Sequence, residues 1–134
     1  MKNIKARVWN SLNKSFTYPE SPVNIMCVYV NPSILIGLDG SIFEFVGGQY
    51  IKYIQPDNES DKYVIDMYSG VPDKFGNRIY ENDIIKYTFP DHTSIVGYVE
   101  YSSGSFRCNW PDQTDDDIGY MLTKSMEVIG HNHK

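Results

Sequence analysis

Residues 84–110, IIKYTFPDHTSIVGYVEYSSGSFRCNW, decide the fold of this chain. Three runs rich in β-branched and aromatic residues, 84–89, 94–101 and 105–110, are separated by Pro-Asp-His and by Ser-Ser-Gly. Short apolar runs divided by turn residues are typical of strands joined in antiparallel hairpins. The stretch therefore predicts three consecutive strands, the last two of which form a hairpin around residues 102–104.

The residues that follow this stretch predict how the sheet is completed. Residues 112–117 are an acidic run, which predicts a loop; residues 118–124 fit a single helical turn, and 126–130 predict a closing strand. Four or five short strands with tight turns and almost no helix favour a small closed barrel, because closure hides the edges of a short sheet.

The N-terminal half also predicts strands. Residues 4–9 alternate apolar and polar side chains, and residues 24–30 form a continuous apolar run. Two further β-prone runs within residues 34–46 flank Asp39-Gly40. Asp-Gly favours a tight hairpin turn, because both central residues of that turn need positive φ. The hairpin 34–46 is thus the firmest local prediction in this half.

A polar segment predicts the boundary between two parts of the chain. Residues 55–62 contain no apolar residue except proline, which indicates a solvated loop, while residues 49–54 fit either a strand or a short helix. We therefore expect an N-terminal β segment over residues 1–62 and a β-barrel over residues 63–134. The predicted fold class is mainly β, with little helix.

Composition and charge bound the class of the protein. With 134 residues, of which 41% are hydrophobic, the chain can fold as one ordinary domain or two very small ones without a metal or a disulfide. The formal net charge is −5 and the basic residues are scattered singly. Non-specific binding to nucleic acid requires clustered Lys and Arg, so it is disfavoured. Cys27 and Cys108 lie in separate apolar runs, which favours buried, reduced thiols over a disulfide.

The sequence predicts no association with a membrane. No apolar stretch approaches the roughly 20 residues that span a bilayer. The first residues, 1–5, contain no apolar signal core. We therefore expect a cytoplasmic protein.

Catalytic and cofactor-binding motifs are absent from the sequence. No two glycines are spaced Gly-x-Gly, and neither a Gly-x-Ser-x-Gly elbow nor a His-Glu-x-x-His pair occurs. Pro-Asp occurs repeatedly, but no Asp or Glu is followed two residues later by Lys, which disfavours a metal-dependent nuclease. We therefore expect no enzymatic activity, no cofactor and no metal.

Several polar residues have a second interpretation. His131 and His133 could face one side as metal ligands, but zinc needs further ligands that are not evident, which favours a polar tail. The acidic run 112–117 lacks the spacing of a calcium loop, and it fits a solvated loop or a contact for a basic partner. His92 and Glu20 have no identifiable catalytic partner and are interpreted as loop and turn residues.

The central run of the chain carries a family resemblance. Residues 68–85 are YSGVPDKFGNRIYENDII, which is similar to the run YTGLKDKNGKEIYEGDIV of the YopX family of phage and prophage proteins. Residues 4–10 resemble the opening motif of that family, Phe-Arg-Ala-Trp-Asp, and segments at 97–101 and 127–130 follow in the expected order. The resemblance implies an SH3-like barrel in the C-terminal half, a bacterial or phage source and a cytoplasmic setting. It carries over no catalytic residue.

Within this run, three residues are predicted to shape turns. Gly76 or Asn77 is expected to adopt positive φ in a tight turn, and Asn82 replaces a glycine of the family pattern in a second turn. Asp83 is placed to accept backbone N–H bonds just before a strand. Phe75 departs from the pattern, because an aromatic ring stands where a small polar residue is usual; it either caps the barrel or is exposed for a partner.

The function predicted from these observations is a non-enzymatic binding module of a phage or prophage. Small barrels bind peptide or nucleic acid in grooves lined by exposed aromatic residues. The alternative is a structural protein that forms homo-oligomers through exposed β edges, and a hydrolase with an unorthodox site comes third. The candidate partner-binding residues are Trp9, Phe75, Tyr80, Tyr87 and Trp110.

Overall fold

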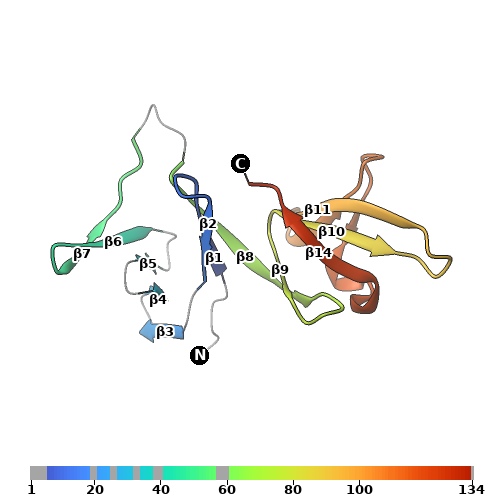
Figure 1. Cartoon of the computed structure of the whole chain (residues 1–134), viewed down its shortest axis with the longest axis horizontal. Coiled ribbons are helices and arrows are strands. Elements are labelled where there is room, and N and C mark those ends of the chain that lie inside the picture. The colour runs from blue at the N-terminus through green and yellow to red at the C-terminus, as the bar shows by residue number, and fades with distance from the viewer. Residues whose placement is uncertain are drawn as a thin grey trace. The chain divides into compact units, whose positions relative to one another are not determined.

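The computed structural model describes residues 6–18, 21–24, 27–31, 34–37, 41–56 and 61–133. These residues form a mainly β protein with little helix, as predicted (Figure 1). The chain divides into two compact units, one of residues up to Asp66 and one of Met67–His133. Each unit has its own core of buried side chains.

The N-terminal unit contains a five-stranded antiparallel sheet and part of a second sheet. Its five-stranded sheet has the order β3-β4-β5-β6-β7, and its second sheet pairs β1 with β2 and also includes β8. The bounds are β1 (Ala6–Asn10), β2 (Ser15–Thr17), β3 (Ser21–Asn24), β4 (Cys27–Asn31), β5 (Ile34–Gly37), β6 (Ile42–Val46), β7 (Gln49–Lys52) and β8 (Tyr63–Pro72).

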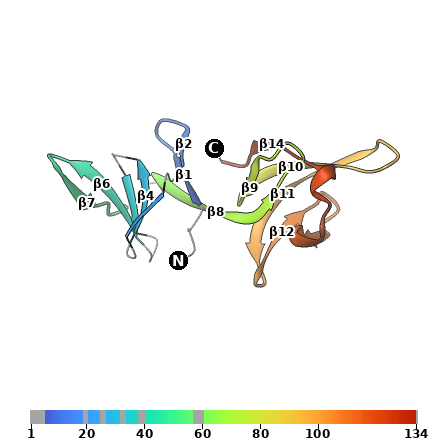
Figure 2. The same ribbon diagram turned by 90° about the horizontal axis from the view of Figure 1, so that it is seen from below.

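The strands expected on either side of Asp39-Gly40 are adjacent in the five-stranded sheet. β5 and β6 pair antiparallel, with Leu35 opposite Phe43. Asp39 and Gly40 themselves lie outside the described residues. The ambiguous residues 49–54 begin with a strand, β7, which runs antiparallel beside β6 (Figure 2).

The C-terminal unit contains a second five-stranded antiparallel sheet. β8 continues into this unit and pairs with β9, and the sheet has the order β13-β12-β11-β10-β14. This order is compatible with the expected SH3-like barrel. The bounds are β9 (Arg78–Tyr80), β10 (Asp83–Thr88), β11 (Ser94–Ser102), β12 (Ser105–Asn109), β13 (Asp115–Asp117), the 3-10 turns η1 (Ile118–Tyr120) and η2 (Thr123–Ser125), and β14 (Met126–His131).

The C-terminal sheet differs from the prediction in its acidic run. Residues 115–117 form the outer strand β13, which pairs with β12, whereas the sequence predicted a loop. Asp-Asp-Asp has no apolar alternation, so nothing local signals a strand. The backbone of β12 supplies the pairing instead, with Cys108 opposite Asp116. The single helical turn expected over 118–124 is divided into η1 and η2.

The core of the C-terminal unit follows the alternation of its strands. Ile85, Val99 and Cys108 are fully buried, on β10, β11 and β12 respectively. Ile118 and Met126 close the core from η1 and β14. Burial raises the pKa of the Cys108 thiol to about 12, so the thiol stays protonated and packs as a small apolar side chain. The side chain of Cys27 lies outside the described residues.

The N-terminal unit has a smaller apolar core and a buried ion pair. Val8 and Ile42 are buried and form its core cluster, with the half-buried Tyr53, Tyr63 and Ile65 packed against them. Arg7 donates a hydrogen bond from Nε to Oδ2 of Asp66 at 2.9 Å, and both side chains are buried. The Arg7 guanidinium also lies 4.0 Å from the centroid of the Phe16 ring. Ion pairing and ring contact together accommodate a charge that would otherwise be costly to bury.

Candidate functional site

The turn between β8 and β9 is organised by Asp73. The buried Asp73 carboxylate accepts N–H bonds from Phe75 and Asn77, both at 2.9 Å, through Oδ1. Its Oδ2 accepts the N–H of Val128 at 3.0 Å, which attaches the turn to β14. Gly76 adopts φ +82°, a left-handed conformation that favours glycine.

These hydrogen bonds also determine the charge state of Asp73. Burial acts to raise the pKa of the Asp73 carboxyl, but the N–H bonds from Val128, Asn77 and Phe75 outweigh burial and the pKa is lowered. Asp73 is therefore ionised at neutral pH and serves as a fixed acceptor for three backbone donors.

A second turn precedes β10 and involves two more of the predicted turn residues. Asn82 adopts φ +67°, and its N–H donates to the carbonyl of Val99 at 2.8 Å. Asp83 is buried, and its Oδ2 accepts the N–H of Tyr80 at 2.8 Å. In the structure, Gly76 and Asn82 thus lie in backbone turns, and Asp83 is the first residue of β10, where its carboxylate stabilises the turn before the strand.

The structure separates the five aromatic candidates for partner binding. Trp9 and Tyr80 are buried, and their rings contact Phe16 and Tyr68, with centroids 4.8 and 5.7 Å apart. Phe75 is exposed in the β8–β9 turn, with 68% of its surface accessible. Tyr87 and Trp110 are brought together, with ring centroids 6.5 Å apart in an edge-to-face contact.

Tyr87 and Trp110 line an open cleft of about 680 Å³ in the C-terminal unit. Tyr87 also contacts Phe89, with ring centroids 5.3 Å apart. Alternation along β10 places Ile85 and Tyr87 on one face, and Phe89 directly follows the strand; the three side chains change from buried through half-buried to exposed. The cleft is therefore the open end of the core face of the sheet. Its lining is completed by Ile95, Arg107, Thr114, Asp116, Asp117, Tyr120 and Met121.

Trp110 is held in this cleft by two hydrogen bonds and a close packing contact. Its indole Nε1–H donates to Oδ2 of Asp116 at 2.7 Å, and its backbone N–H donates to the carbonyl of Thr114 at 2.9 Å. Beneath the ring lies Gly97, where a Cβ atom would be 2.6 Å from the indole Cε3 and 2.3 Å from the carbonyl oxygen of Asn109. Position 97 therefore accommodates only glycine without movement of its neighbours.

The charges at the cleft are mainly negative. Arg107 pairs with Asp115, with Nη2 to Oδ1 at 3.0 Å, and this hydrogen bond raises the pKa of the guanidinium further. The carboxylates of Asp116 and Asp117 accept hydrogen bonds from neutral donors, the indole of Trp110 and the N–H of Gly119. Both carboxylates also attract the Arg107 guanidinium. With one cation and two carboxylates in the lining, the cleft keeps a net negative charge.

The exposed rim of the cleft is aromatic. Tyr120 at the end of η1 has 90% of its surface accessible, and Phe89, directly after β10, has 43%. Large aromatic side chains left in water beside a cleft mark a surface that can be covered by a ligand. The cleft thus combines the exposed rings of Phe89 and Tyr120 with the largely buried ring of Trp110. The carboxylates of Asp116 and Asp117 lie in the same lining.

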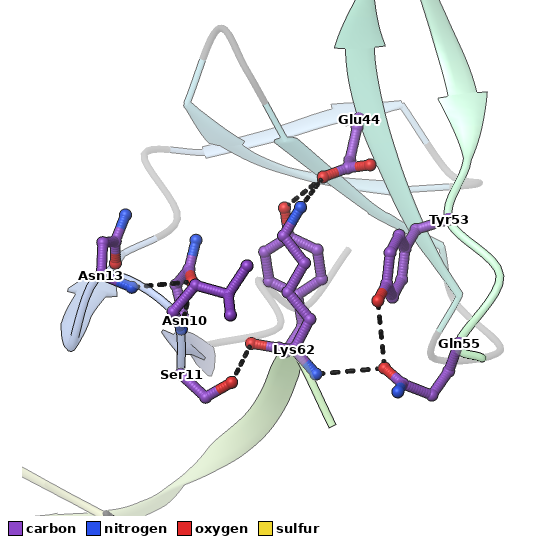
Figure 3. Close-up of polar contacts among 9 residues, drawn as sticks. Asn10, Ser11, Asn13, Glu44, Tyr53, Gln55 and Lys62 are labelled. Carbon is purple, nitrogen blue, oxygen red and sulfur yellow. Dashed lines mark hydrogen bonds and ion pairs between the residues drawn. The ribbon is translucent and has the colours of Figure 1, made fainter. Parts of the chain in front are cut away.

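A separate polar cluster in the N-terminal unit holds a lysine in place (Figure 3). Lys62 Nζ donates to Glu44 Oε2 at 2.8 Å and lies 5.3 Å from the ring centroid of Tyr53 and 5.1 Å from that of Tyr63. The Tyr63 hydroxyl donates to the same Glu44 oxygen. Burial, then the bond to Glu44, raises the pKa of Tyr63 to about 12.

Backbone bonds attach this cluster to its surroundings. The backbone N–H of Lys62 and the Tyr53 hydroxyl both donate to Gln55 Oε1, at 3.0 and 3.1 Å (Figure 3). Ser11 donates from its backbone N–H to the Lys62 carbonyl at 2.8 Å. Because each polar group contacts another group of the same unit, the cluster stabilises the N-terminal fold.

Within the part of the chain that the structure describes, no group of three or more His, Cys, Asp or Glu side chains is arranged to hold a metal ion. Among the same residues, no helix has the length and apolar character needed to cross a membrane. The rings of His131 and His133 lie 5.7 Å apart, and the His133 N–H donates to Nδ1 of His131 at 3.3 Å.

The fold places this chain in the class of small, mainly β proteins that are built from short antiparallel strands. The family is shown by the sequence, because the chain matches the model of the YopX protein family over residues 7–134 and thus belongs to that family. The resemblance carried by residues 68–85 is therefore confirmed.

Two solved structures share the fold. The YopX protein of Bacillus subtilis is 21% identical, with a TM-score of 0.60 over 95% of this chain and 91% of that chain. Protein EF1440 of Enterococcus faecalis is 20% identical, with a TM-score of 0.55 over 97% of this chain and 93% of that chain. The comparison with curated proteins gave no match.

Sequence reasoning missed most of the residues that form the cleft. Tyr120 and Phe89 were not among the predicted binding residues, although each is an aromatic residue directly beside a turn or loop. In the sequence, Asp116 and Asp117 stand out only as part of an acidic run. The signal that could have found them is the sequence Trp-x5-Asp-Asp-x2-Tyr, in which two aromatic residues enclose paired carboxylates.

Proposed function

We propose that this protein is a non-enzymatic module that binds a segment of a protein partner in the cleft of its C-terminal unit. The observation that carries the proposal is the cleft itself, a space of about 680 Å³ lined by Tyr87, Phe89, Trp110 and Tyr120. Rigid aromatic side chains provide large contact areas with little loss of conformational entropy, and they are enriched where proteins bind one another. The family resemblance supports a role in a phage or prophage, in the cytoplasm of a bacterial host.

A peptide suits this cleft better than a nucleic acid does. Nucleic-acid binding relies on cationic side chains that neutralise phosphates, and stacking on aromatic rings adds to it. The cation in the lining, Arg107, is already paired with Asp115, whereas Asp116 and Asp117 add negative charge. Repulsion between these carboxylates and a phosphate backbone opposes nucleic-acid binding.

The proposal is tested by probing an array of short random peptides with labelled protein. Wild-type protein is expected to retain a reproducible subset of peptides, because the cleft offers a defined set of ring faces and acceptors. Tyr120→Ala removes an exposed ring from the rim, and 90% exposure of that residue means that the fold tolerates the change. We expect this variant to lose most of the retained peptides.

Phe75→Ala is the matched control, because Phe75 is also an exposed aromatic residue but does not line the cleft. Retention of the same peptides by this variant assigns binding to the cleft. Loss with Phe75→Ala and not with Tyr120→Ala moves the site to the β8–β9 turn. If wild-type protein retains no peptide above background, the proposal fails.

Self-association is the second candidate, and an exposed edge strand favours it. Among the described residues, β7 is the last strand in the order of the N-terminal five-stranded sheet. Ile51 on this strand is 48% exposed, and Val46 next to it is 52% exposed. Edge strands of this kind can pair between copies of a chain. Sedimentation that shows a monomer at micromolar concentration would remove this candidate.

A further inference from the structure

We infer that the cleft recognises a cationic side chain, so that the bound segment inserts a Lys or Arg residue between the aromatic rings and the carboxylates. This inference rests on the proposed function and specifies the chemistry of its ligand. Charge complementarity selects the occupant: aromatic faces attract cations through their quadrupoles, and carboxylates accept hydrogen bonds from guanidinium and ammonium groups.

The negative charge of the cleft is held in place by the protein. Asp116 accepts the indole N–H of Trp110 at 2.7 Å, and Asp117 accepts the N–H of Gly119 at 2.8 Å. Each carboxylate has about four lone-pair sites, so one such hydrogen bond leaves capacity for a ligand donor. Both side chains line the cleft on β13. A contact for a basic partner is the second interpretation that the sequence of the acidic run allows.

The rings are arranged in a contiguous series beside these carboxylates. Phe89 contacts Tyr87, and Tyr87 contacts Trp110, in edge-to-face pairs with interplanar angles of 66° and 70°. In edge-to-face packing the planes of neighbouring rings are steeply inclined to one another. The three rings therefore offer both ring faces and ring edges to a ligand in the cleft. A guanidinium is planar and weakly hydrated, which suits it to stack on a ring while it donates to a carboxylate.

The same chain already contains this combination of groups around a cation. In the N-terminal unit, Lys62 lies within 5.3 Å of the ring centroids of Tyr53 and Tyr63 and donates to Glu44. There the two rings, the carboxylate and the lysine all belong to the protein. In the cleft, the rings and carboxylates are present, and the one cation of the lining, Arg107, is hydrogen-bonded to Asp115 and also attracted by Asp116 and Asp117, so that one cation faces three carboxylates.

The test compares two short synthetic peptides of Gly, Ser and Leu by isothermal titration calorimetry. One contains two arginines, and in the other both are replaced by citrulline, which has nearly the same shape without the charge. We expect the arginine peptide to bind at least about tenfold more tightly, the ratio that one cation–aromatic contact with carboxylate support provides. The preference should shrink at an ionic strength of about 1 M, where the Debye length falls to about 3 Å.

The protein variants identify which charges are responsible. Asp116→Asn with Asp117→Asn removes two charges from the cleft, while each amide oxygen can still accept the bond that its carboxylate accepts. This double variant is expected to bind both peptides equally. The matched control, Asp91→Asn with Glu100→Gln, removes two charges from exposed residues that do not line the cleft, and it should keep the preference.

The outcomes separate this inference from the proposed function. Equal binding of the two peptides by wild-type protein overturns the cationic ligand but leaves peptide binding intact. If both double variants lose the preference for the arginine peptide equally, the preference arises from the overall charge of the protein. That result overturns the role of the cleft. Failure of wild-type protein to retain any peptide, in the titration and on the array alike, contradicts the module itself. Thermal unfolding of each variant establishes that the fold is kept.

Discussion

Gly97 and Trp110 are in such close contact that a Cβ atom at position 97 would lie 2.6 Å from Cε3 of the indole. The glycine on β11 therefore sets the depth at which the Trp110 ring lies in the cleft. Because Trp110 also anchors Asp116 through its indole N–H, this one packing contact positions both an aromatic ring and a carboxylate of the candidate site.

Gly97→Ala is expected to destabilise the C-terminal unit by about 1–3 kcal/mol, because the added methyl group overpacks a filled site. The backbone oxygen of Asn109, 2.3 Å from the new Cβ, cannot move without disturbing the pairing of β11 with β12. Chemical denaturation measures the loss, and the tryptophan emission spectrum reports displacement of the indole. Gly104→Ala is not a suitable control, since its φ of +85° adds backbone strain; Val96→Ala on the same strand is better.

Asp73→Ala is expected to cost about 3 kcal/mol, because it leaves the N–H groups of Phe75, Asn77 and Val128 without their carboxylate acceptor. Equilibrium denaturation in urea measures the change. Asp112→Ala is the matched control, since that exposed carboxylate caps a local turn at Thr114. Equal losses in the two variants would show that the connection to β14 contributes nothing.

The contribution of Asp73 should also depend on pH. Its pKa is lower in the folded chain than the usual unfolded value, so the unfolded state binds more protons as acid is added. The stabilisation is therefore present above the unfolded pKa and is lost as the pH falls through the folded pKa. The difference in unfolding free energy between wild type and Asp73→Asn should shrink in that acidic range, and a difference independent of pH would contradict the assignment.

Arg7→Leu should destabilise the N-terminal unit by about 3–5 kcal/mol, because it leaves the Asp66 carboxylate buried without its cation. A further change of Asp66 to Leu should recover much of the loss, since both charges are then absent. A thermodynamic cycle of the single and double variants, measured by denaturation, gives the coupling energy. A coupling near zero would mean that the two groups do not stabilise each other.

Tyr63 should ionise at a pH of about 12, well above the usual tyrosine pKa, because burial and the bond to Glu44 disfavour the phenolate. The raised pKa contributes stability that is present below the unfolded pKa near 10 and is lost as the pH rises through the folded value. Ultraviolet absorbance during an alkaline titration measures this ionisation, with Tyr63→Phe as the reference. An unchanged titration curve in that variant would refute the assignment.

Much of the fold could be predicted from the sequence because its signals are local. Alternation and turn residues in 84–110 predicted β10, β11 and β12, and the run 126–130 predicted the closing strand. The strand β13 could not be predicted, because its three aspartates have no strand signal of their own and depend on the backbone of β12. Asp73 shows the same limit, since its bond to Val128 joins residues far apart in the chain.

The candidate site was less predictable than the fold. An aromatic residue in a β-rich chain can lie in a core or at a surface, and periodicity alone does not distinguish the two. Trp9 and Tyr80 are buried, whereas Phe89 and Tyr120, which sequence reasoning did not select, are exposed at the cleft. Their exposure depends on where β10 and η1 end relative to the core face of the sheet, which is a property of the folded unit.

The position of β13 at the margin of its sheet has one more consequence. If β13 of a second copy of the chain paired with β13 to extend the sheet, the three aspartates of one strand would face the three of the other. Like charges on directly opposite residues of paired strands repel. Polymerisation through this margin is therefore opposed, while a strand or loop that brings lysine or arginine meets attraction there. The three aspartates of β13 thus oppose pairing between copies of this chain and favour basic over acidic partners.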